Sequence, residues 1–356
     1  SGNNLRGQIP EELCNIDVCG FECNNSNYVF SGNNFCPPYP ECFTEMSTAE
    51  NTINIINNQL CNLYPNCSEG YTAIANPPPI NNRNIYDGYC FYQDDLDILQ
   101  DIINSNSNLG NLSPLELGIQ TWYIIDWNNS GSLEVSLNGR LGSLDISDLP
   151  ITNFPESIVN LDKLEYLNFS NTQLSTIPES IGYLTELESI FAIGGQLTGP
   201  IPPELGNLTN LTSLRLQDNQ LTGPIPPELG NLTKLTYLWV QDNQLTGSIP
   251  AELGNTNLHW LDLSRNQLTG EVPMEIWNIN AHYSQSDTPY ESQGESLRRI
   301  SIRENNLTGV IPESICDINL RWRAFNFIDL RDNKFCPPYP SCLDNRTGQQ
   351  DISNCD

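Results

Sequence analysis

The chain of 356 residues carries 43 acidic and 15 basic residues, which gives a formal net charge of −28, and 38% of its residues are hydrophobic. This charge argues against nucleic acids and anionic membranes as partners, because both are themselves negatively charged. No apolar run approaches the ~20 residues of a membrane span. No signal peptide precedes the first motif, which fits a mature or processed secreted chain.

A motif at the start of the chain returns near its end. Residues 1–14 and 303–316 share the pattern Asn-Asn-Leu-x-Gly-x-Ile-Pro-Glu-x-Leu/Ile-Cys, and both run on to Phe-Cys-Pro-Pro-Tyr-Pro-x-Cys, at 35–42 and 335–342. The sequence therefore opens with the tail of one repeat domain and later contains a whole second one. We expect five parts: a partial repeat tail with a cysteine cap (1–42), an irregular Cys- and Asn-rich connector (43–90), a helical N-terminal cap (91–140), the repeats (141–335) and a C-terminal cysteine cap (336–356).

Residues 93–104 predict an amphipathic helix. Its apolar face comprises Leu96, Ile98, Leu99, Ile102 and Ile103, and two aspartates suit the positive N-terminus. We expect this helix to cover the open first repeat.

A weak calcium signal follows the predicted helix. Asp126, Asn128, Ser130 and Glu134 have the spacing of half a calcium-binding loop, but Leu137 stands where the loop would carry its bidentate Glu. A polar turn is the favoured interpretation, and calcium is the one cofactor that the sequence suggests.

A repeat of the form Leu-x-x-Leu-x-Leu-x-x-Asn-x-Leu begins at Leu141. We number its positions by offset from the first Leu. Offsets 0, 3, 5 and 10 are expected to point inward, and offsets 2, 4 and 6 outward from a short strand, because side chains alternate across a strand. The Asn at offset 8 is expected to bond neighbouring backbone turns as a ladder. The frame starts at Leu141, Leu164, Leu187, Leu211, Leu235, Leu258, Leu297 and Phe325, with an insertion near 281–295.

The second half of each repeat reads Leu-Thr-Gly-x-Ile-Pro-x-x-Leu-Gly-Asn-Leu, as at 221–232. Gly permits a turn and Pro fixes φ, so this half cannot be a long helix. The pattern resembles the plant-type leucine-rich repeats of receptor-kinase ectodomains, of polygalacturonase-inhibiting proteins and of secreted microbial proteins. That resemblance implies a leucine-rich-repeat solenoid with parallel strands on its concave face. It also implies a second small strand near Leu-Thr-Gly, short 3₁₀ turns on the convex side and capped ends.

All twelve cysteines lie towards the two ends of the chain, eight between Cys14 and Cys90 and four between Cys316 and Cys355. Paired cysteines indicate an oxidising, extracellular compartment. Metal binding is the weaker alternative, because no Cys-x-x-Cys pair and no nearby His accompanies them. The plant-type cap, which closes a local disulfide, implies the pairs Cys36–Cys42, Cys61–Cys67 and Cys336–Cys342.

Ten Asn-x-Ser/Thr sequons are possible glycosylation sites, and chance explains several of them in so Asn-rich a chain. They begin at Asn24, Asn66, Asn111, Asn128, Asn168, Asn207, Asn210, Asn231, Asn306 and Asn345.

The sequence contains no catalytic constellation, and we predict that the protein is not an enzyme. The two histidines, His259 and His282, supply little for Ser-His or Cys-His chemistry. The outward strand positions instead predict a concave binding surface, because exposed aromatic residues with Arg mark interfaces. The alternative is that these aromatic residues only pack against one another across the strands. The predicted surface comprises Tyr166, Phe191, Arg215, Tyr237, Trp239, Trp260, Arg265, Arg299 and Arg303.

Two functions fit these features. The first is a secreted structural protein that self-associates head to tail. The unequal distribution of charge fits this function: residues 1–139 hold 2 basic and 16 acidic residues, whereas residues 298–356 hold 8 of each. Ordinary surface variation in an acidic protein is the alternative explanation of the charge. The second is an extracellular binding module that takes a peptide, glycan or protein ligand on the concave face.

Overall fold

The computed structural model describes residues 6–8, 34–36, 71–73, 90–127, 133–277, 299–316, 327–343 and 347–355. The chain divides into two compact units, which are described separately. One unit comprises residues 1–96 and 122–140, and the other comprises residues 97–121 and 141–356.

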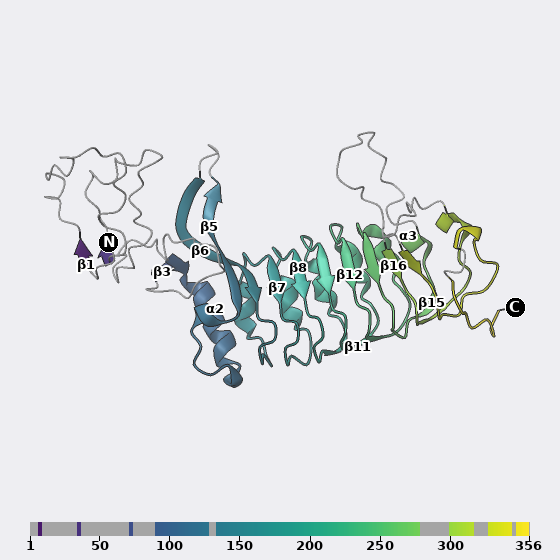
Figure 1. Cartoon of the computed structure of the whole chain (residues 1–356), viewed down its shortest axis with the longest axis horizontal. Coiled ribbons are helices and arrows are strands. Elements are labelled where there is room, and N and C mark those ends of the chain that lie inside the picture. The colour runs from purple at the N-terminus through teal and green to yellow at the C-terminus, as the bar shows by residue number, and fades with distance from the viewer. Residues whose placement is uncertain are drawn as a thin grey trace, which may run out of the picture. The chain divides into compact units, whose positions relative to one another are not determined.

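The larger unit is a stack of repeats, each of which begins with a short parallel strand (Figure 1). Equivalent positions lie side by side, because Leu214 pairs with Leu238 and Leu238 pairs with Leu261. The predicted strand register is therefore confirmed. The strands of this sheet are β6 (Leu133–Asp145, through its last three residues), β7 (Tyr166–Asn168), β8 (Ser189–Phe191), β10 (Ser213–Arg215), β12 (Tyr237–Trp239), β14 (Trp260–Asp262), β16 (Arg299–Ser301) and β18 (Phe327–Asp329).

The inward positions form the core of the stack. In the repeat that starts at Leu211, the residues at offsets 0, 3, 5 and 10 are all fully buried. Their burial removes apolar surface from water in every repeat, which is the main force that holds the stack together.

A second column of short strands follows the Leu-Thr-Gly segments, as the family resemblance implied. Here β9 (Thr198–Gly199), β11 (Gln220–Gly223) and β13 (Gln244–Leu245) pair in parallel, and β15 (Thr269–Glu271) pairs with β17 (Asn306–Thr308).

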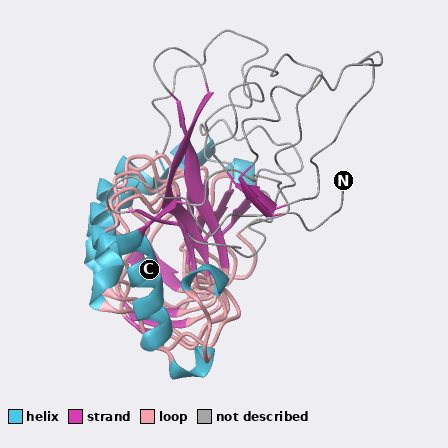
Figure 2. Ribbon diagram, turned by 90° about the vertical axis from the view of Figure 1, so that its left-hand side faces the viewer, coloured by secondary structure: helices cyan, strands magenta, loops and turns pink. Residues whose placement is uncertain are grey.

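The Ile-Pro segments lead into short helical turns, which gather on one side of the repeats in Figure 2. Proline precedes most of these turns in extended geometry, as Pro226 does before η8 with φ at −64°. A Cβ on Gly230 would lie 2.4 Å from the carbonyl oxygen of Glu252, so only glycine permits the turns to stack this closely. The turns are η5 (Glu156–Asn160), η6 (Glu179–Tyr183), η7 (Pro203–Asn207), η8 (Pro227–Asn231), η9 (Ala251–Asn255), α3 (Met274–Trp277), η10 (Glu313–Cys316) and η11 (Ser341–Leu343).

The asparagine ladder is confirmed. Asn243 donates from Nδ2 to the carbonyl oxygens of Leu216 (2.9 Å) and Val240 (3.1 Å), and its Oδ1 accepts from the amide of Leu221 (2.9 Å). Each ladder Asn thus joins its own repeat to the preceding one. The same pattern recurs at Asn219, Asn266, Asn305 and Asn333.

The helix predicted over 93–104 is present as α2 (Gln93–Asn104). After it come η3 (Ser107–Leu109) and η4 (Pro114–Glu116). Asn106, which is buried, donates to the carbonyl oxygen of Asn153 (2.8 Å) and accepts from the amide of Thr152 (2.7 Å). This side chain therefore satisfies the backbone of the first repeat, which carries no Asn at offset 8.

The smaller unit contains strands that the sequence did not predict. Strand β1 (Arg6–Gln8) pairs in parallel with β2 (Asn34–Cys36), and β3 (Tyr71–Ala73) pairs antiparallel with β4 (Cys90–Tyr92). Strand β4 also pairs with β6, which is the partner of β5 (Ile119–Trp127). The proposed boundaries at 42, 90, 140 and 335 stay predictions, and the insertion near 281–295 lies outside the described residues.

The predicted disulfide Cys336–Cys342 is wrong. The structure joins Cys316 to Cys342 and Cys336 to Cys355. Cys342 lies in η11, which packs against η10, the turn that ends at Cys316. The backbone of Cys336 instead bridges to Val310, in the column of second strands. The stacking of consecutive repeats therefore decides the pairing, rather than closeness in sequence.

The same correspondence predicts a disulfide near the start of the chain. Gln8 and Val310 hold the same position in the repeated motif, and so do Cys36 and Cys336. Gln8 pairs with Cys36, just as Val310 bridges to Cys336. In the repeated motif, Cys14 takes the place of Cys316 and Cys42 that of Cys342. By sequence, this correspondence favours Cys14–Cys42 over Cys36–Cys42; Cys14 and Cys42 lie outside the described residues, so Cys36–Cys42 stays a prediction. Mass spectrometry of peptides from the unreduced protein checks this expectation, and a peptide linking Cys36 to Cys42 would contradict it. The predicted pair Cys61–Cys67 lies outside the described residues.

Candidate functional site

The outward strand positions form rows that run across the parallel strands on the concave face. Offset 2 carries Tyr166, Tyr237 and Trp260, and offset 4 carries Phe191 and Trp239; all five side chains are half-buried. Strand pairing places Tyr237 beside Trp260 and Arg215 between Phe191 and Trp239. The structure thus brings the predicted aromatic residues onto one surface.

Aromatic and arginine side chains form one continuous row on this surface. The guanidinium carbon of Arg215 lies 4.4 Å from the ring centroid of Phe191 and 4.3 Å from that of Trp239. On the next strand, Trp260 packs on Trp239 with 4.5 Å between the ring centroids. Arg299 in turn lies 4.6 Å from the Trp260 ring. We call these five residues the aromatic–arginine ladder.

Two further contacts attach tyrosines to this ladder. Tyr166 meets the Phe191 ring edge to face at 5.2 Å between centroids, and Tyr237 meets Trp239 in the same geometry at 6.3 Å. Burial raises the pKa of Tyr166, and the nearby carboxylate of Asp145 raises it further. The Tyr166 hydroxyl is therefore neutral near pH 7 and serves as a hydrogen-bonding group.

The aromatic rings pack against each other and against arginine, as the alternative interpretation expects, whereas binding by this surface stays a prediction. The packing organises the rings, as cross-strand pairs do. The ladder nevertheless stays half-exposed, although the indole Nε1 atoms of Trp239 and Trp260 and the Nε atom of Arg299 are buried.

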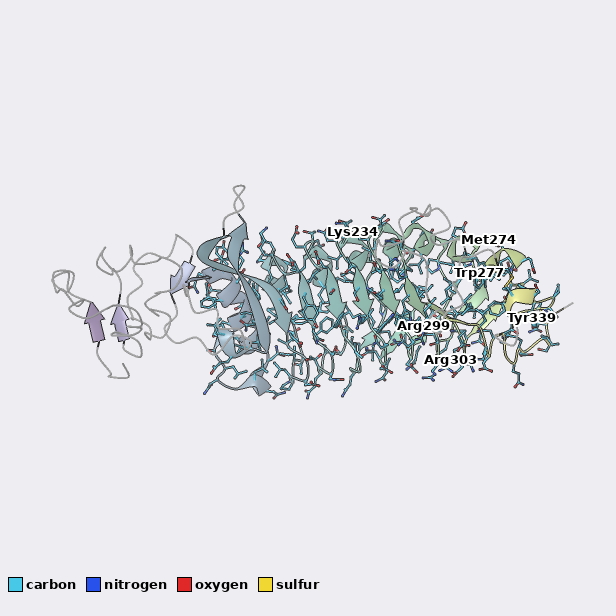
Figure 3. All side chains as sticks on the ribbon, turned by 45° about the horizontal axis from the view of Figure 1, so that its top comes forward. Lys234, Met274, Trp277, Arg299, Arg303 and Tyr339 are labelled. Carbon is cyan, nitrogen blue, oxygen red and sulfur yellow. A yellow bond between two sulfur atoms is a disulfide. The ribbon has the colours of Figure 1, made fainter. Side chains whose placement is uncertain are left out.

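A polar hollow of about 380 Å³ adjoins the ladder at its C-terminal end, where Arg299 and Arg303 are labelled in Figure 3. It contains three of the predicted surface residues, together with several that the sequence analysis did not single out. Its lining residues are Gln241, Asp242, Asp262, Ser264, Arg265, Arg299, Ser301, Arg303, Asp329 and Arg331.

The arginines of this hollow are paired with carboxylates. Arg331 binds Asp329 through two hydrogen bonds, of 2.7 and 2.6 Å, and Arg303 Nε lies 3.7 Å from the same carboxylate. Arg265 Nη1 binds Asp242 at 3.0 Å, and Arg299 Nη2 lies 4.0 Å from Asp262. The charge of these arginines is therefore largely compensated within the protein.

Asp262 and Asp329 are both buried, but their environments shift their pKa values in opposite directions. Burial raises the pKa of Asp262, and hydrogen bonds from Ser264 together with the charge of Arg299 offset only part of this effect. Burial also acts to raise the pKa of Asp329, but the hydrogen bonds and charge of Arg331 outweigh it and lower the pKa below its ordinary value. Both aspartates lie at offset 4, an outward position, and that offset is the signal that could have identified them from sequence.

Arg265 occupies a special backbone position. It lies at offset 7, where φ is positive in each of the seven repeats that carry a non-glycine residue there, including Asp218 (60°), Asp242 (56°) and Arg265 (52°). Asp and Asn tolerate this left-handed conformation better than Arg does. The contacts of Arg265 with Asp242 and Glu304 link three consecutive repeats.

The predicted sequons differ in exposure. Asn111, Asn207 and Asn231 are exposed, whereas Asn168, Asn210 and Asn306 are half-buried. Asn168 lies in strand β7 of the concave face, where its Oδ1 accepts from the amide and hydroxyl of Ser170. The first three are therefore the better acceptors on structural grounds. The sequons at Asn24, Asn66, Asn128 and Asn345 lie outside the described residues.

Neither a metal site nor a membrane span is evident in the described part of the chain. No group of three or more His, Cys, Asp or Glu side chains there is arranged to hold a metal ion. Within the calcium candidate, Asn128 and Ser130 lie outside the described residues, while Asp126 and Glu134 belong to strands β5 and β6. Among the described helices, none is both long and apolar enough to cross a membrane.

Comparison with known proteins identifies the family. The family model described as "Leucine-rich repeat region" matches residues 139–317, about half of the chain. The protein is therefore a member of the leucine-rich-repeat family, and nothing in its described residues indicates catalysis. No curated protein sequence matches the chain.

Several solved structures are similar to part of this chain, and the first of them shares its fold. The PEPR1–AtPEP1 complex is 24% identical, with a TM-score of 0.51, and the match covers 69% of this chain and 32% of that one. The plant peptide hormone receptor RGFR1, in complex with RGF2, is 29% identical, with a TM-score of 0.46 and coverages of 55% and 32%. The leucine-rich-repeat protein LIC12759 of Leptospira interrogans is 25% identical, with a TM-score of 0.44 and coverages of 56% and 45%. This chain thus spans less than half the length of each.

Proposed function

We propose that the chain is an extracellular, non-enzymatic binding module whose concave face holds an extended peptide or protein segment. The aromatic–arginine ladder is the observation that carries this proposal. It places half-exposed aromatic and arginine side chains, the residue types that dominate binding energy at interfaces, on one rigid row of strands. The two disulfides support an oxidising compartment.

The ladder favours a peptide over a neutral glycan. A sugar ring stacks on an aromatic face, but Trp239 has Arg215 on one side and Trp260 on the other. The Trp260 ring likewise lies between Trp239 and Arg299. A peptide does not need a free ring face, because its backbone and side chains can contact the parts of these half-buried side chains that stay exposed.

Substitution of the ladder tryptophans tests the proposal. For a peptide selected from a displayed random library by the intact protein, Trp239→Ala and Trp260→Ala should each weaken binding by ~2 kcal/mol or more. Isothermal titration calorimetry measures this change. The control is Tyr183→Ala, which truncates a 64% exposed aromatic residue in η6, on the opposite side of the repeats. Equal affinities for all three variants and the unaltered protein would defeat the assignment to the concave face.

Self-association is the second candidate function, because residues 1–139 hold 16 acidic and 2 basic residues while residues 298–356 are neutral overall. Association between these regions would be electrostatic and would weaken with salt. Light scattering on the same protein samples distinguishes the two functions. A molecular mass that grows at low salt supports assembly. A constant monomer mass contradicts assembly and leaves ligand binding as the one remaining candidate function.

A further inference from the structure

Arg215 differs from the other arginines of the concave face. Its guanidinium lies between two aromatic rings, Phe191 on strand β8 and Trp239 on strand β12. These neighbouring strands pair directly with β10, so one ring flanks the guanidinium on each side. Such stacking fixes the orientation of an otherwise flexible side chain before any ligand arrives.

Arg215 also differs in its partners. Arg140, Arg265, Arg299, Arg303 and Arg331 each have a carboxylate within ion-pair distance. Arg215 makes no ion pair with any described residue. Its single hydrogen bond to a described group runs from Nε to the hydroxyl of Ser213, at 3.3 Å. The N–H groups of its two terminal nitrogens therefore have no described acceptor.

The geometry points to Arg215 as the residue that binds a carboxylate of the ligand, an inference that rests on the proposed binding function. With a ring on either side, the guanidinium offers its edge, where its N–H donors lie in one plane. A carboxylate is planar and accepts two parallel hydrogen bonds in that plane. The ligand would thus be a peptide with an acidic side chain or a free C-terminus seated over strand β10.

The arginines nearer the C-terminus are less suited to this role. A ligand carboxylate at Arg331 would have to displace Asp329, which already makes two hydrogen bonds to that guanidinium. At Arg265 it would compete with both Asp242 and Glu304. At Arg215 no described carboxylate needs to be displaced, so the full charge of the side chain is available.

The overall negative charge of the protein limits this attraction to short range. Asp218 and Asp242 lie at offset 7 of the repeats around Arg215, and the net charge of −28 repels acidic ligands at a distance. Recognition must therefore come from direct contact. A single acidic group at a fixed position should suit the site, whereas a run of acidic residues should bind poorly.

A displayed library of random peptides tests the inference with the full chain. The unaltered protein should enrich peptides with one Asp, Glu or free C-terminus at a constant position. The binding of a selected peptide should weaken by about 10- to 100-fold in Arg215→Gln. Arg215→Lys should recover only part of the loss, because lysine keeps the charge but lacks the planar fork. Lys234→Gln, which removes the same charge outside the concave rows, should bind as the unaltered protein does.

Chemical variants of the selected peptide complete the experiment. Replacing its Glu by Gln, or its C-terminal acid by an amide, identifies which carboxylate is bound, and that replacement should have little further effect in Arg215→Gln. If selected peptides show no acidic preference but lose binding in Trp239→Ala, the concave site stands and the role of Arg215 is overturned. Arg215-dependent binding of uronate oligosaccharides, without any peptide binding, would overturn the peptide assignment. Failure to select any ligand would count against both proposals.

Discussion

Replacing Asn243 by alanine should lower the free energy of unfolding by about 2–4 kcal/mol, because it leaves a buried backbone group without a partner and removes several hydrogen bonds. The amide of Leu221 has the Oδ1 of Asn243 as its acceptor, at 2.9 Å. The carbonyl oxygens of Leu216 and Val240 each lose one donor. The surrounding leucines are fully buried, so these backbone groups have little access to bulk water.

Urea denaturation followed by circular dichroism measures this loss. Asn231→Ala, at an exposed position in η8, is the control and should change stability by no more than about 0.5 kcal/mol. Equal midpoints for the two variants would show that the ladder contributes little to stability.

Substitution of the two buried aspartates of the polar hollow should give opposite dependences on pH. Asp329→Asn should lower stability at neutral pH by about 2–3 kcal/mol, because Arg331 loses two charge-assisted hydrogen bonds. The folded state lowers the pKa of Asp329 below 3.8, so its contribution is complete above 3.8 and is lost as the pH falls below that value. The deficit of this variant should therefore shrink in acid.

Asp262→Asn should behave differently, because the folded state raises the pKa of Asp262 above 3.8. Ionisation of this carboxylate costs stability as the pH rises through the folded pKa. The stability of the asparagine variant relative to the unaltered protein should therefore increase from acid to neutral pH. Thermal unfolding of both variants at neutral pH and below 3.8 is the measurement. The same sign of pH dependence in both would contradict the assigned environments.

The fold was predictable from sequence because one pattern recurs. Each inward offset carries a residue such as Leu214 or Leu238 whose burial alone selects the register, and each Asn at offset 8 has only a few backbone partners within reach. The disulfides at the C-terminal end were not predictable by proximity. Cys342 pairs with a residue 26 positions earlier, because η11 stacks on η10.

The site was predictable in its residue types but not in the division of roles. The sequence places Arg215, Arg299 and Arg303 on one face, but it does not show which of these arginines has its charge compensated by a carboxylate. That distinction depends on Asp262 and Asp329, whose carboxylates reach arginines of the neighbouring repeats. Likewise, the spacing of Trp239 and Trp260 indicates a shared surface, but only the structure shows that the two rings contact each other, with 4.5 Å between their centroids.

The stack also sets a rule for how this protein can change in length. Residues 200–223 and 224–247 are almost the same sequence, and both carry the glycine that permits tight stacking and the asparagine that joins adjacent turns. Duplicating such a unit would preserve every local contact, because each repeat touches only its neighbours. A copy inserted between β10 and β12 would separate Arg215 from Trp239 by one further strand spacing, about 4.8 Å. Duplication or loss of whole repeats can therefore change the distance between ligand-binding side chains only in steps of one strand spacing.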